Sequence, residues 1–391
     1  MPLYIHIPFC LKKCDYCDFF SKILEDSRFI VKNFTINDYI EALLNQISFF
    51  IERFYVKNFT SIYIGGGTPS ILSARQLERL CEKIAPLAEN AEFTIEINPG
   101  DLTEDFLRAA SSGGINRLSL GIQCKSDEVL RAVGRRTTVF QIENAVSLIK
   151  KFWRGAWSAD FIAGLPFQSK EMLKDDIDFA TENGAGHISL YSLAVEEGTP
   201  LAEKIDSGKT RYDADLADEI WLFGRERLEK KGFLQYEISN FAKKGFESRH
   251  NLSYWTLCDY LGAGAGATGT VGEKRFTNTR DIAKYIEFWK NSSVKIQTRE
   301  IPGKKEILDF KTREFEFLMM GFRTLRGVSA REYERRFTGD LASRLGADKV
   351  DGVFSRWEKK GLAHKTTIQG ETFFSLTRDG ILFLNKFLQE T

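Results

Sequence analysis

The sequence lacks an excess of charge of either sign. Among its 391 residues, 55 are Lys or Arg and 54 are Asp or Glu, so we expect no nucleic acid or anionic membrane as a general partner. It also lacks an apolar run of about 20 residues, which excludes a predicted membrane span but leaves peripheral membrane contact open. The N-terminus has neither the basic start nor the long apolar stretch of a secretory signal, so we expect a cytoplasmic location.

Cysteine is scarce as well, and its distribution excludes a disulfide framework. Only six cysteines occur, and three of them, Cys10, Cys14 and Cys17, lie within eight positions. The other three are scattered at Cys81, Cys124 and Cys258, and we expect these to be free thiols. In a cytosolic chain, a cluster of cysteines more often binds metal than forms disulfides.

The first 200 residues alternate between short apolar runs and amphipathic segments. The runs predict strands at 3–9, 61–64, 93–97, 117–122, 159–162 and 187–193. The segments predict helices at 38–54, 74–88, 104–111, 139–152 and 170–182. Repeated strand–helix units imply parallel strands joined by right-handed crossovers. Six such units are too few for a closed eight-fold barrel, so the pattern favours an α/β fold built on a partial (β/α)6 barrel.

Polar residues follow these predicted strands where each one ends. The cysteines follow the first strand, Gly-Gly-Gly-Thr-Pro closes the second at 65–69, and Glu96, Gln123 and Asp160 lie on the next three. Because the active sites of parallel barrels form at the carboxyl ends of the strands, these side chains are expected at one mouth.

Beyond the barrel we expect a different organisation. A helix is predicted at 213–231, and an irregular stretch follows with His-Asn-x-x-Tyr-Trp at 250–255 and a Gly/Ala run at 262–267. That run is too small-sided for a packed strand, and it indicates backbone passing close to a ligand or to another segment. Helices at 311–326, 350–360 and 378–389, with a hairpin at 364–376, outline a small winged-helix-like unit. The predicted domains are therefore 1–240, 241–300 and 301–391.

The cysteine trio predicts an iron–sulfur cluster. Cys10-x3-Cys14-x2-Cys17 supplies three thiolates for a [4Fe–4S] cubane and leaves the fourth iron open. An open iron can chelate the amino and carboxylate groups of S-adenosylmethionine, the sulfonium compound of radical chemistry. The alternative is a structural zinc site made of the same cysteines and His6.

Together the motifs resemble the radical S-adenosylmethionine proteins of the coproporphyrinogen-dehydrogenase-like group, and within it the heme-chaperone branch (HemW type). The resemblance rests on Tyr-Ile-His-Ile-Pro-Phe-Cys at 4–10, Gly-Gly-Gly-Thr-Pro-Ser at 65–70, Gly-Ile-Gln at 121–123, Gly-Leu-Pro at 164–166 and the 250–255 motif. It implies S-adenosylmethionine contacts from ten residues: Tyr4, Tyr16, Gly66, Gly67, Thr68, Glu96, Gln123, Arg135, Asp160 and Ala194. By this resemblance, Arg135 pairs with the methionine carboxylate, whereas an internal Arg135–Asp160 ion pair is the alternative.

Heme is the second ligand that the resemblance implies. His250, Asn251, Tyr254 and Trp255 are candidate heme contacts, with the His250 nitrogen as an axial ligand. The residues alone favour a structural role, in which His250 and Asn251 tie the loop to the barrel. Partners implied by the resemblance are heme, heme-acceptor proteins and an electron donor. Whether the chain turns over a substrate stays open.

The competing branch is the oxygen-independent coproporphyrinogen III oxidase, which decarboxylates its substrate by radical chemistry. That branch has a fourth cysteine two residues after the third, where this chain has Phe19, and a longer N-terminal arm than this chain shows. Histidines that the family often has are replaced here by Thr137 and Thr268, which places roles tied to them in doubt.

Overall fold

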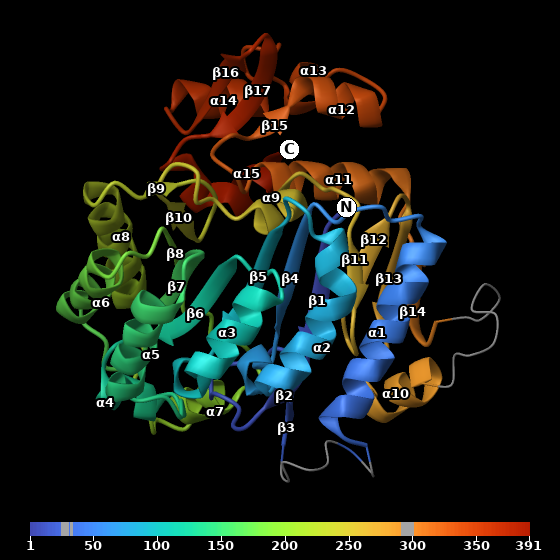
Figure 1. The fold of residues 1–391 in the computed structure, drawn as a ribbon. Coiled ribbons are helices and arrows are strands. Elements are labelled where there is room, and N and C mark those ends of the chain that lie inside the picture. The colour runs from blue at the N-terminus through green and yellow to red at the C-terminus, as the bar shows by residue number, and fades with distance from the viewer. Residues whose placement is uncertain (25–30, 32–33, 291–300) are drawn as a thin grey trace.

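The computed structural model describes residues 1–24, 31, 34–290 and 301–391 (Figure 1). Within them the main sheet has nine strands in the order β11-β1-β4-β5-β6-β7-β8-β10-β9. Their bounds are β1 Leu3–Ile7, β4 Ser61–Gly66, β5 Glu92–Ile97, β6 Arg117–Gln123, β7 Ala156–Ala163, β8 His187–Ser192, β9 Leu234–Gln235, β10 Asn240–Ala242 and β11 Leu261–Ala263. The strands from β11 to β8 pair in parallel, and β10 and β9 add an antiparallel edge.

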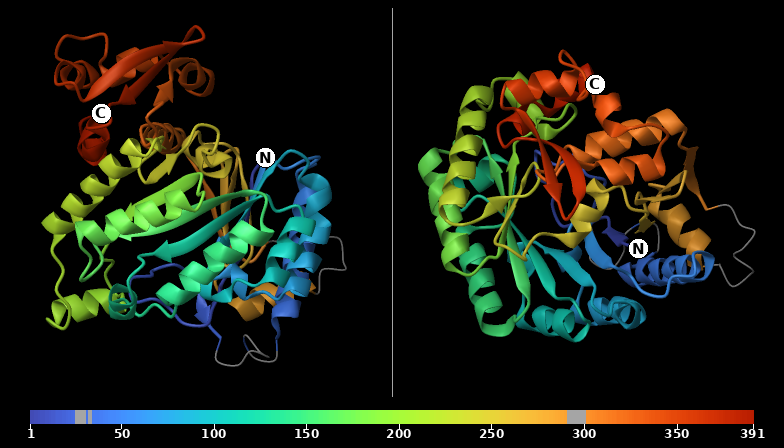
Figure 2. Two further views of the ribbon diagram at one scale, coloured as in Figure 1. Left: turned by 60° about the vertical axis from the view of Figure 1, so that its left-hand side comes forward. Right: turned by 90° about the horizontal axis from the view of Figure 1, so that it is seen from above.

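Amphipathic helices cover the outer face of this curved sheet, which is seen from above in Figure 2. They are α1 Ile36–Arg53, α2 Ala74–Ile84, α3 Glu104–Ser112, α5 Val139–Phe152, α6 Lys170–Glu182 and α8 Ala214–Lys230. The short helices α4 Asp127–Ala132 and α7 Pro200–Asp206 lie instead at the carboxyl end of the strands (Figure 1). Capping boxes start α1, α2 and α5 at Thr35, Ser73 and Thr138, where a side chain satisfies a free backbone N–H. The partial (β/α)6 barrel predicted from the sequence is confirmed; the predicted elements shift at their ends, and α4 and α7 are additional helices that were not predicted.

The segment after the barrel contradicts two predictions. The Gly/Ala run does contain a packed strand, because β11 pairs with β1 at the edge of the main sheet. Its small residues are required by a close neighbour: a Cβ on Gly262 would lie 2.0 Å from the Thr268 carbonyl oxygen. The predicted boundary at 240/241 falls inside β10, so it separates no structural unit.

Together with residues 303–307 from beyond the predicted boundary at 300/301, the same segment forms a second sheet. It consists of β12 Thr268–Val271, β13 Lys274–Asn278 and β14 Gly303–Ile307. Two further helices belong to this region: α9 Arg249–Trp255, and α10 Ile282–Lys290, which packs on α1.

The C-terminal part has its own core and the order of a winged helix. Its elements are α11 Phe310–Gly321, β15 Val328–Ser329, α12 Ala330–Arg336, α13 Leu341–Leu345, α14 Val353–Lys359, β16 Ala363–Ile368, β17 Glu371–Leu376 and α15 Leu384–Glu390. A separate apolar cluster that includes Phe322, Phe354 and Phe387 holds it together. This unit lies over the amino-terminal ends of the sheet strands (Figure 1).

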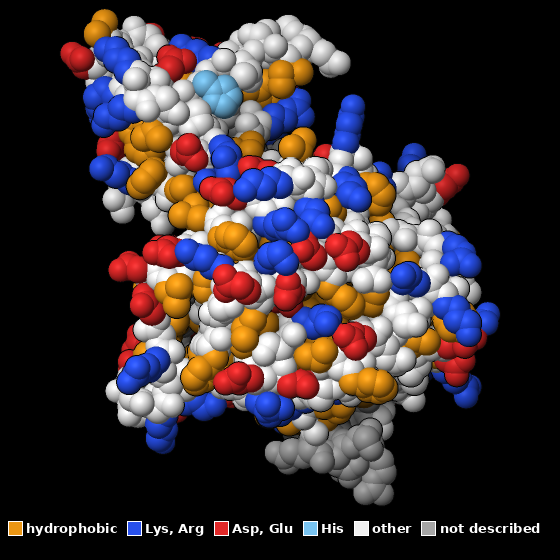
Figure 3. Space-filling view, turned by 90° about the vertical axis from the view of Figure 1, so that its left-hand side faces the viewer, with side chains coloured by type: hydrophobic (Ala, Val, Ile, Leu, Met, Phe, Trp, Pro, Cys, Tyr) orange, Lys and Arg blue, Asp and Glu red, His pale blue; other side chains and the backbone are white. Residues whose placement is uncertain are grey.

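The surface carries both charges side by side. On the face over α6 and α8, Lys and Arg side chains alternate with Asp and Glu (Figure 3). Several are paired, such as Lys170 with Glu219 at 2.8 Å and Arg227 with Asp178 at 2.6 Å. This face therefore has no stripe of one sign for nucleic acid. Among the helices of the described part, none has the length and apolarity needed to cross a membrane.

Candidate functional site

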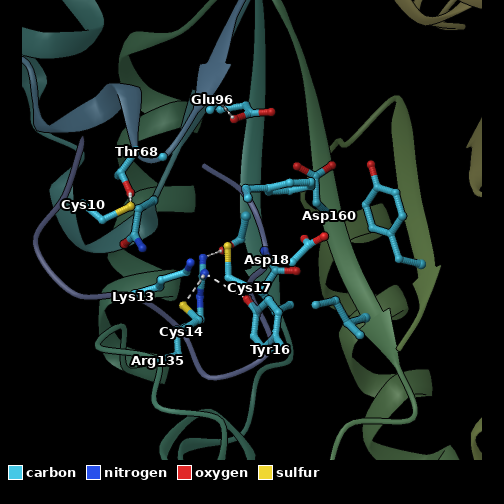
Figure 4. A pocket seen from close by; sticks show the side chains of 18 of the residues that line it. Cys10, Lys13, Cys14, Tyr16, Cys17, Asp18, Thr68, Glu96, Arg135 and Asp160 are labelled. Atoms are coloured by element: carbon cyan, nitrogen blue, oxygen red, sulfur yellow. Dashed lines mark hydrogen bonds between the residues drawn. The ribbon is translucent and has the colours of Figure 1, made fainter. Parts of the chain in front are cut away.

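A cavity of about 390 Å³ opens at the carboxyl ends of the parallel strands. It contains all three motif cysteines and nine of the ten residues predicted to hold S-adenosylmethionine, listed here: Cys10, Cys14, Cys17, Tyr16, Gly66, Gly67, Thr68, Glu96, Gln123, Arg135, Asp160 and Ala194. These residues come from segments that are as far apart in the chain as Cys10 and Ala194. The convergence predicted from the strand ends is therefore present; Figure 4 shows part of it.

The cysteine loop leaves β1 and folds under the barrel mouth. Cys10 lies at the end of the short strand β2, Phe9–Cys10, which pairs with β3, Lys22–Ile23. A backbone bond from Cys17 N–H to the Cys14 carbonyl closes the tight turn between the other two thiols. Asp15 fixes the outer side, because its carboxylate accepts a 2.6 Å bond from Lys204 of α7. The loop thus has its conformation set by the protein around it.

The glycines of 65–69 allow this loop to lie close to β4. A Cβ on Gly67 would lie 2.7 Å from the Phe9 carbonyl oxygen and 3.0 Å from Cys10 Sγ. Gly66 adopts a φ of +120°, which L side chains rarely adopt, and a Cβ there would meet the His6 ring at 2.6 Å. Thr68 Oγ1 points at Cys10 Sγ, 3.5 Å away. Backbone proximity, and not a side-chain contact, is what the two glycines contribute.

We predict that Gly67→Ala reduces cluster loading without unfolding the protein. The added methyl group presses on Phe9 backbone that cannot rotate away, a change that costs about 1–3 kcal/mol. Iron content after anaerobic reconstitution and the melting temperature are the measurements. Gly100→Ala is the matched control, because its Cβ would meet side-chain atoms and no backbone: Gln141 at 3.2 Å and Asn98 Oδ1 at 3.4 Å. Equal iron content in wild type and Gly67→Ala would contradict the close-packing argument.

Arg135 lies beneath the cysteine loop as a half-buried cation. Its Nη1 donates to Tyr16 Oη at 3.2 Å and to Cys14 Sγ at 3.6 Å, and its Nη2 donates to the Gly121 carbonyl. Burial by itself lowers the pKa of Arg135, but the Tyr16 and Cys14 groups outweigh it and the net shift is upward. Its Nε is buried with no partner among the described residues, so it remains able to bond an anionic group in the cavity. Among the residues that the structure describes, Arg135 and Asp160 form no ion pair with each other.

Two half-buried carboxylates face the cavity from the other side. Glu96 Oε1 accepts from the Tyr63 hydroxyl at 2.9 Å, and its Oε2 accepts from the Gly66 N–H at 3.1 Å. Burial raises the pKa of Glu96 to about 7, and the nearby Asp160 charge adds to the shift. Asp160 accepts from Ser119 at 2.7 Å, and burial raises its pKa too. Two desolvated acids in one cavity are stabilised by a bound cation.

The donor set fits the cofactors that the motif implies. Three thiols on one loop suit a cluster with one open iron, while Glu96 and Asp160 suit the sulfonium and the ribose of S-adenosylmethionine. The sequence reasoning missed Tyr63, Ser119 and Tyr191, which also line the cavity. Ser119 lies an even number of positions from Gly121 and Gln123 on β6, so strand alternation could have found it, whereas Tyr63 and Tyr191 lie at odd spacings from the other lining residues of their strands, Gly66 and Ser192.

Tyr4 and His6 do not line the cavity but support it from behind. The Tyr4 hydroxyl bonds His6 Nδ1 at 2.9 Å, and His6 Nε2 bonds the Phe20 carbonyl at 2.9 Å. With both ring nitrogens engaged, His6 is not free to complete a zinc site. Among the described residues, no three His, Cys, Asp or Glu side chains are grouped to hold one metal ion.

Other singled-out positions have local roles. Gln123 has a φ of +67° beside an irregularity in the β6–β7 pairing, which turns it toward the cavity. The two residues at family histidine positions bond locally: Thr137 donates to Asn98 at 2.7 Å, and Thr268 lies 2.9 Å from the Thr277 hydroxyl. Phe19, at the position of the oxidase's fourth cysteine, is 67 % exposed at the rim of the cavity.

The 250–255 motif lies at the opposite end of the barrel. It forms α9, whose first turn is held by Glu92 at the start of β5 through the His250 N–H at 2.9 Å. His250 is buried; its Nδ1 bonds Ser61 Oγ and its Nε2 bonds Tyr254 Oη, both at 2.9 Å. Neither nitrogen is free to reach an iron in this arrangement. The structure thus gives His250 the tying role of the alternative interpretation, which corrects its prediction as an axial ligand.

The other motif residues are also partly enclosed. Asn251 bonds through its backbone to the Ser248 hydroxyl, which caps the helix. Trp255 has a buried indole N–H without a partner among the described residues, next to the Arg323 guanidinium. Tyr254 faces a second cavity that excludes the cluster loop. The structure therefore does not bring the four heme candidates together with the cysteine site.

Comparison with known proteins places this geometry in context. Residues 4–180 match the model of the radical SAM superfamily. The chain is 36 % identical over 338 residues to heme chaperone HemW of Lactococcus lactis, covering 85 % of this chain and 84 % of that protein. It is 32 % identical to HemW of Bacillus subtilis, covering 98 % and 97 %.

A solved structure has the same fold. Coproporphyrinogen III oxidase (HemN) from Escherichia coli superposes with a TM-score of 0.79 at 20 % identity, covering 99 % of this chain and 89 % of that one. At that identity the likeness concerns the fold alone.

Proposed function

Because this chain belongs to the heme chaperone HemW family within the radical SAM superfamily, we propose that it binds heme and transfers it to acceptor proteins. The observation that carries the proposal is the relationship to HemW proteins along nearly the whole chain, the C-terminal unit included. Phe19 in place of a fourth cysteine agrees with it. We place the protein in the cytoplasm, where free thiols stay reduced, and we expect an electron donor as a further partner.

The superfamily implies a [4Fe–4S] cluster and S-adenosylmethionine. Cys10, Cys14 and Cys17 would hold the cluster, and the cavity residues Gly66, Glu96 and Asp160 would hold S-adenosylmethionine. When bound, this pair supplies one-electron chemistry. The chain's own contribution is to shield the cluster loop, to neutralise thiolate charge with Arg135, and to offer Glu96 and Asp160 as anions in a desolvated cavity.

The alternative, radical decarboxylation of coproporphyrinogen III, rests on the fold shared with that oxidase. It is the less favoured reading, since the near-full-length relatives are heme chaperones by name. Both functions concern porphyrins, so one experiment with two assays separates them.

We predict equimolar heme uptake by the anaerobically reconstituted full chain, and no decarboxylation of coproporphyrinogen III with S-adenosylmethionine and dithionite. Uptake is followed by heme absorbance. Transfer is measured as the rate at which an apo-cytochrome acquires heme from the protein. The rate of spontaneous heme release is measured separately with apomyoglobin as the trap, and transfer should be faster. Strong decarboxylation without heme uptake would overturn the proposal.

Because His250 is buried, His250→Ala is informative only with a folding control. We expect this variant to have a lower melting temperature, because it loses the hydrogen bonds of His250 to Ser61 and Tyr254. Normal stability together with abolished heme absorbance would instead restore His250 as a ligand.

A further inference from the structure

A second and larger cavity lies at the opposite end of the barrel from the cysteine loop. It has a volume of about 660 Å³, and we call it the rear pocket. Its walls come from the segment between α9 and β11, from β12 and β13, and from α11 and α12 of the C-terminal unit. The lining that matters here is Tyr254, Tyr260, Arg313, Met319, Met320 and Arg335.

The rear pocket has the size and the walls for a flat apolar ligand. Ligand cavities usually measure about 300–1,000 Å³ and are lined mainly by apolar and aromatic groups. Tyr254 and Tyr260 meet edge-to-face with ring centroids 4.8 Å apart, and Leu257, Leu308 and Phe337 complete the apolar surface. Because the two ring planes are 81° apart, a planar macrocycle can lie with its face on one of these rings and against the edge of the other.

The charge of the lining favours an anion. Four arginines, Arg275, Arg313, Arg335 and Arg336, line it against two acids, Asp259 and Glu316. Glu316 is occupied by Arg275 in a bidentate pair at 3.0 and 2.6 Å.

Two of these arginines keep donors for a ligand. Arg313 donates from Nη1 to Glu273 at 2.7 Å, which leaves its Nε and Nη2 for a ligand carboxylate. The Arg335 side chain is 67 % exposed at the open side, and it donates from Nε and Nη2 to Glu332 at 2.8 and 2.6 Å, which leaves its Nη1 for a ligand. Arg313 can pair with a carboxylate in a bidentate way and Arg335 can add a single bond, so the rim suits a ligand that carries acid groups at one edge.

Sulfur is concentrated in the same pocket. The chain has four methionines, and two of them, Met319 and Met320 on α11, line this cavity. A methionine thioether is an established axial ligand of heme iron. None of the three motif cysteines is near, so this sulfur is separate from the cluster site.

The position of the rear pocket also gives the 250–255 motif a role. Tyr254 is held by its hydroxyl on His250 Nε2, and the His250 ring stacks on Tyr63 at 5.2 Å. Tyr63 in turn bonds Glu96 at the cysteine-site cavity. His250 is thus a positioning residue that fixes the aromatic wall of the rear pocket and links it to the other cavity through the barrel interior.

We infer that the rear pocket is the heme site: the macrocycle lies against Tyr254 and Tyr260, the propionates meet Arg313 and Arg335, and a thioether of Met319 or Met320 binds the iron. The inference rests on the function proposed above. The pocket lies between the barrel and the C-terminal unit and opens to solvent at Arg335, which gives bound heme a route to an acceptor.

The test compares heme with metal-free protoporphyrin IX on the full chain. Arg313→Gln and Arg335→Gln should each lower the binding affinity for both porphyrins by about tenfold, which is the contribution of one charge-assisted hydrogen bond. The double variant Met319→Leu/Met320→Leu conserves volume, so it should bind protoporphyrin normally but change the absorbance spectrum of bound ferric heme, because the iron loses its thioether ligand. Arg108→Gln, an exposed arginine paired with Glu104 on α3, and Met172→Leu on α6 are the matched controls.

The outcomes are separable. If wild type takes up no heme, the proposed function itself fails. If wild type takes up heme but the arginine variants bind both porphyrins as the controls do, the rear pocket is not the site and the function stands. If the arginine variants weaken binding while the methionine variant keeps the wild-type heme spectrum, the thioether assignment is overturned. Circular dichroism and melting temperature establish that each variant is folded.

Discussion

Cys14→Ala is expected to abolish cluster assembly in an otherwise folded protein. Cys14 is one of three thiols on the loop at the barrel mouth, and its sulfur lies 3.6 Å from the Arg135 guanidinium. Removing a ligand should lower iron and sulfide content by more than about tenfold, since even changes to outer-shell partners reduce metal affinity by about 10–100-fold. Iron and sulfide analysis after anaerobic reconstitution, with the visible absorbance of the cluster, is the measurement.

The matched control for this prediction is Cys81→Ala. Cys81 is a buried thiol on α2, packed with Leu77 and Leu80 in the main core. Its replacement should lower the melting temperature slightly and leave the iron content unchanged. A full cluster in Cys14→Ala, or equal iron loss in both variants, would show that the trio is not the ligand set.

Binding of S-adenosylmethionine is expected to weaken as pH falls through about 7. Glu96 has a pKa raised to about 7 by burial and by the Asp160 charge, so above that pH it is an anion and attracts the cationic ligand. Below it the carboxyl is protonated and the attraction is lost. Because a bound cation favours the ionised carboxylate, binding near neutral pH should also release protons from Glu96.

Glu96→Gln isolates this contribution. At pH 8 it should weaken binding by about 10–100-fold, the range of a charge-assisted bond in a buried site, and its affinity should change less with pH than that of wild type. Calorimetry on cluster-loaded protein in two buffers of different ionisation enthalpy measures affinity and proton release together. Glu104→Gln, an exposed acid on α3, is the control.

Asp160 is the acid whose charge, in addition to burial, raises the pKa of Glu96, while Asp18, Glu196 and the tyrosines Tyr63 and Tyr191 also line the cavity. The titration of Asp160 persists in Glu96→Gln, so only the difference between the two proteins reports on Glu96. Parallel pH profiles in wild type and Glu96→Gln would contradict the assignment.

The local chemistry of the main site could be predicted from the sequence. The spacing of Cys10, Cys14 and Cys17 predicts a ligand set from a single short segment. The alternation of strands and helices predicts that the carboxyl ends of the strands lie together at one end of the barrel. The same reasoning failed at Leu261–Ala263, where small residues form an edge strand because β12 and β13 press against them. The composition of a segment does not show which distant segment will pack against it in the folded protein.

The sequence by itself determined the class of the cofactor and the barrel that presents it, because both depend on spacing and on periodicity within short segments. Only the tertiary structure decided that His250 is enclosed, that Glu96 and Asp160 share one desolvated cavity, and that arginines and methionines from the C-terminal unit line the rear pocket beside Tyr254. The burial of a side chain, its pKa and the walls of a pocket depend on contacts between segments that are distant in the sequence. These contacts form only when the chain folds, so no single segment predicts them.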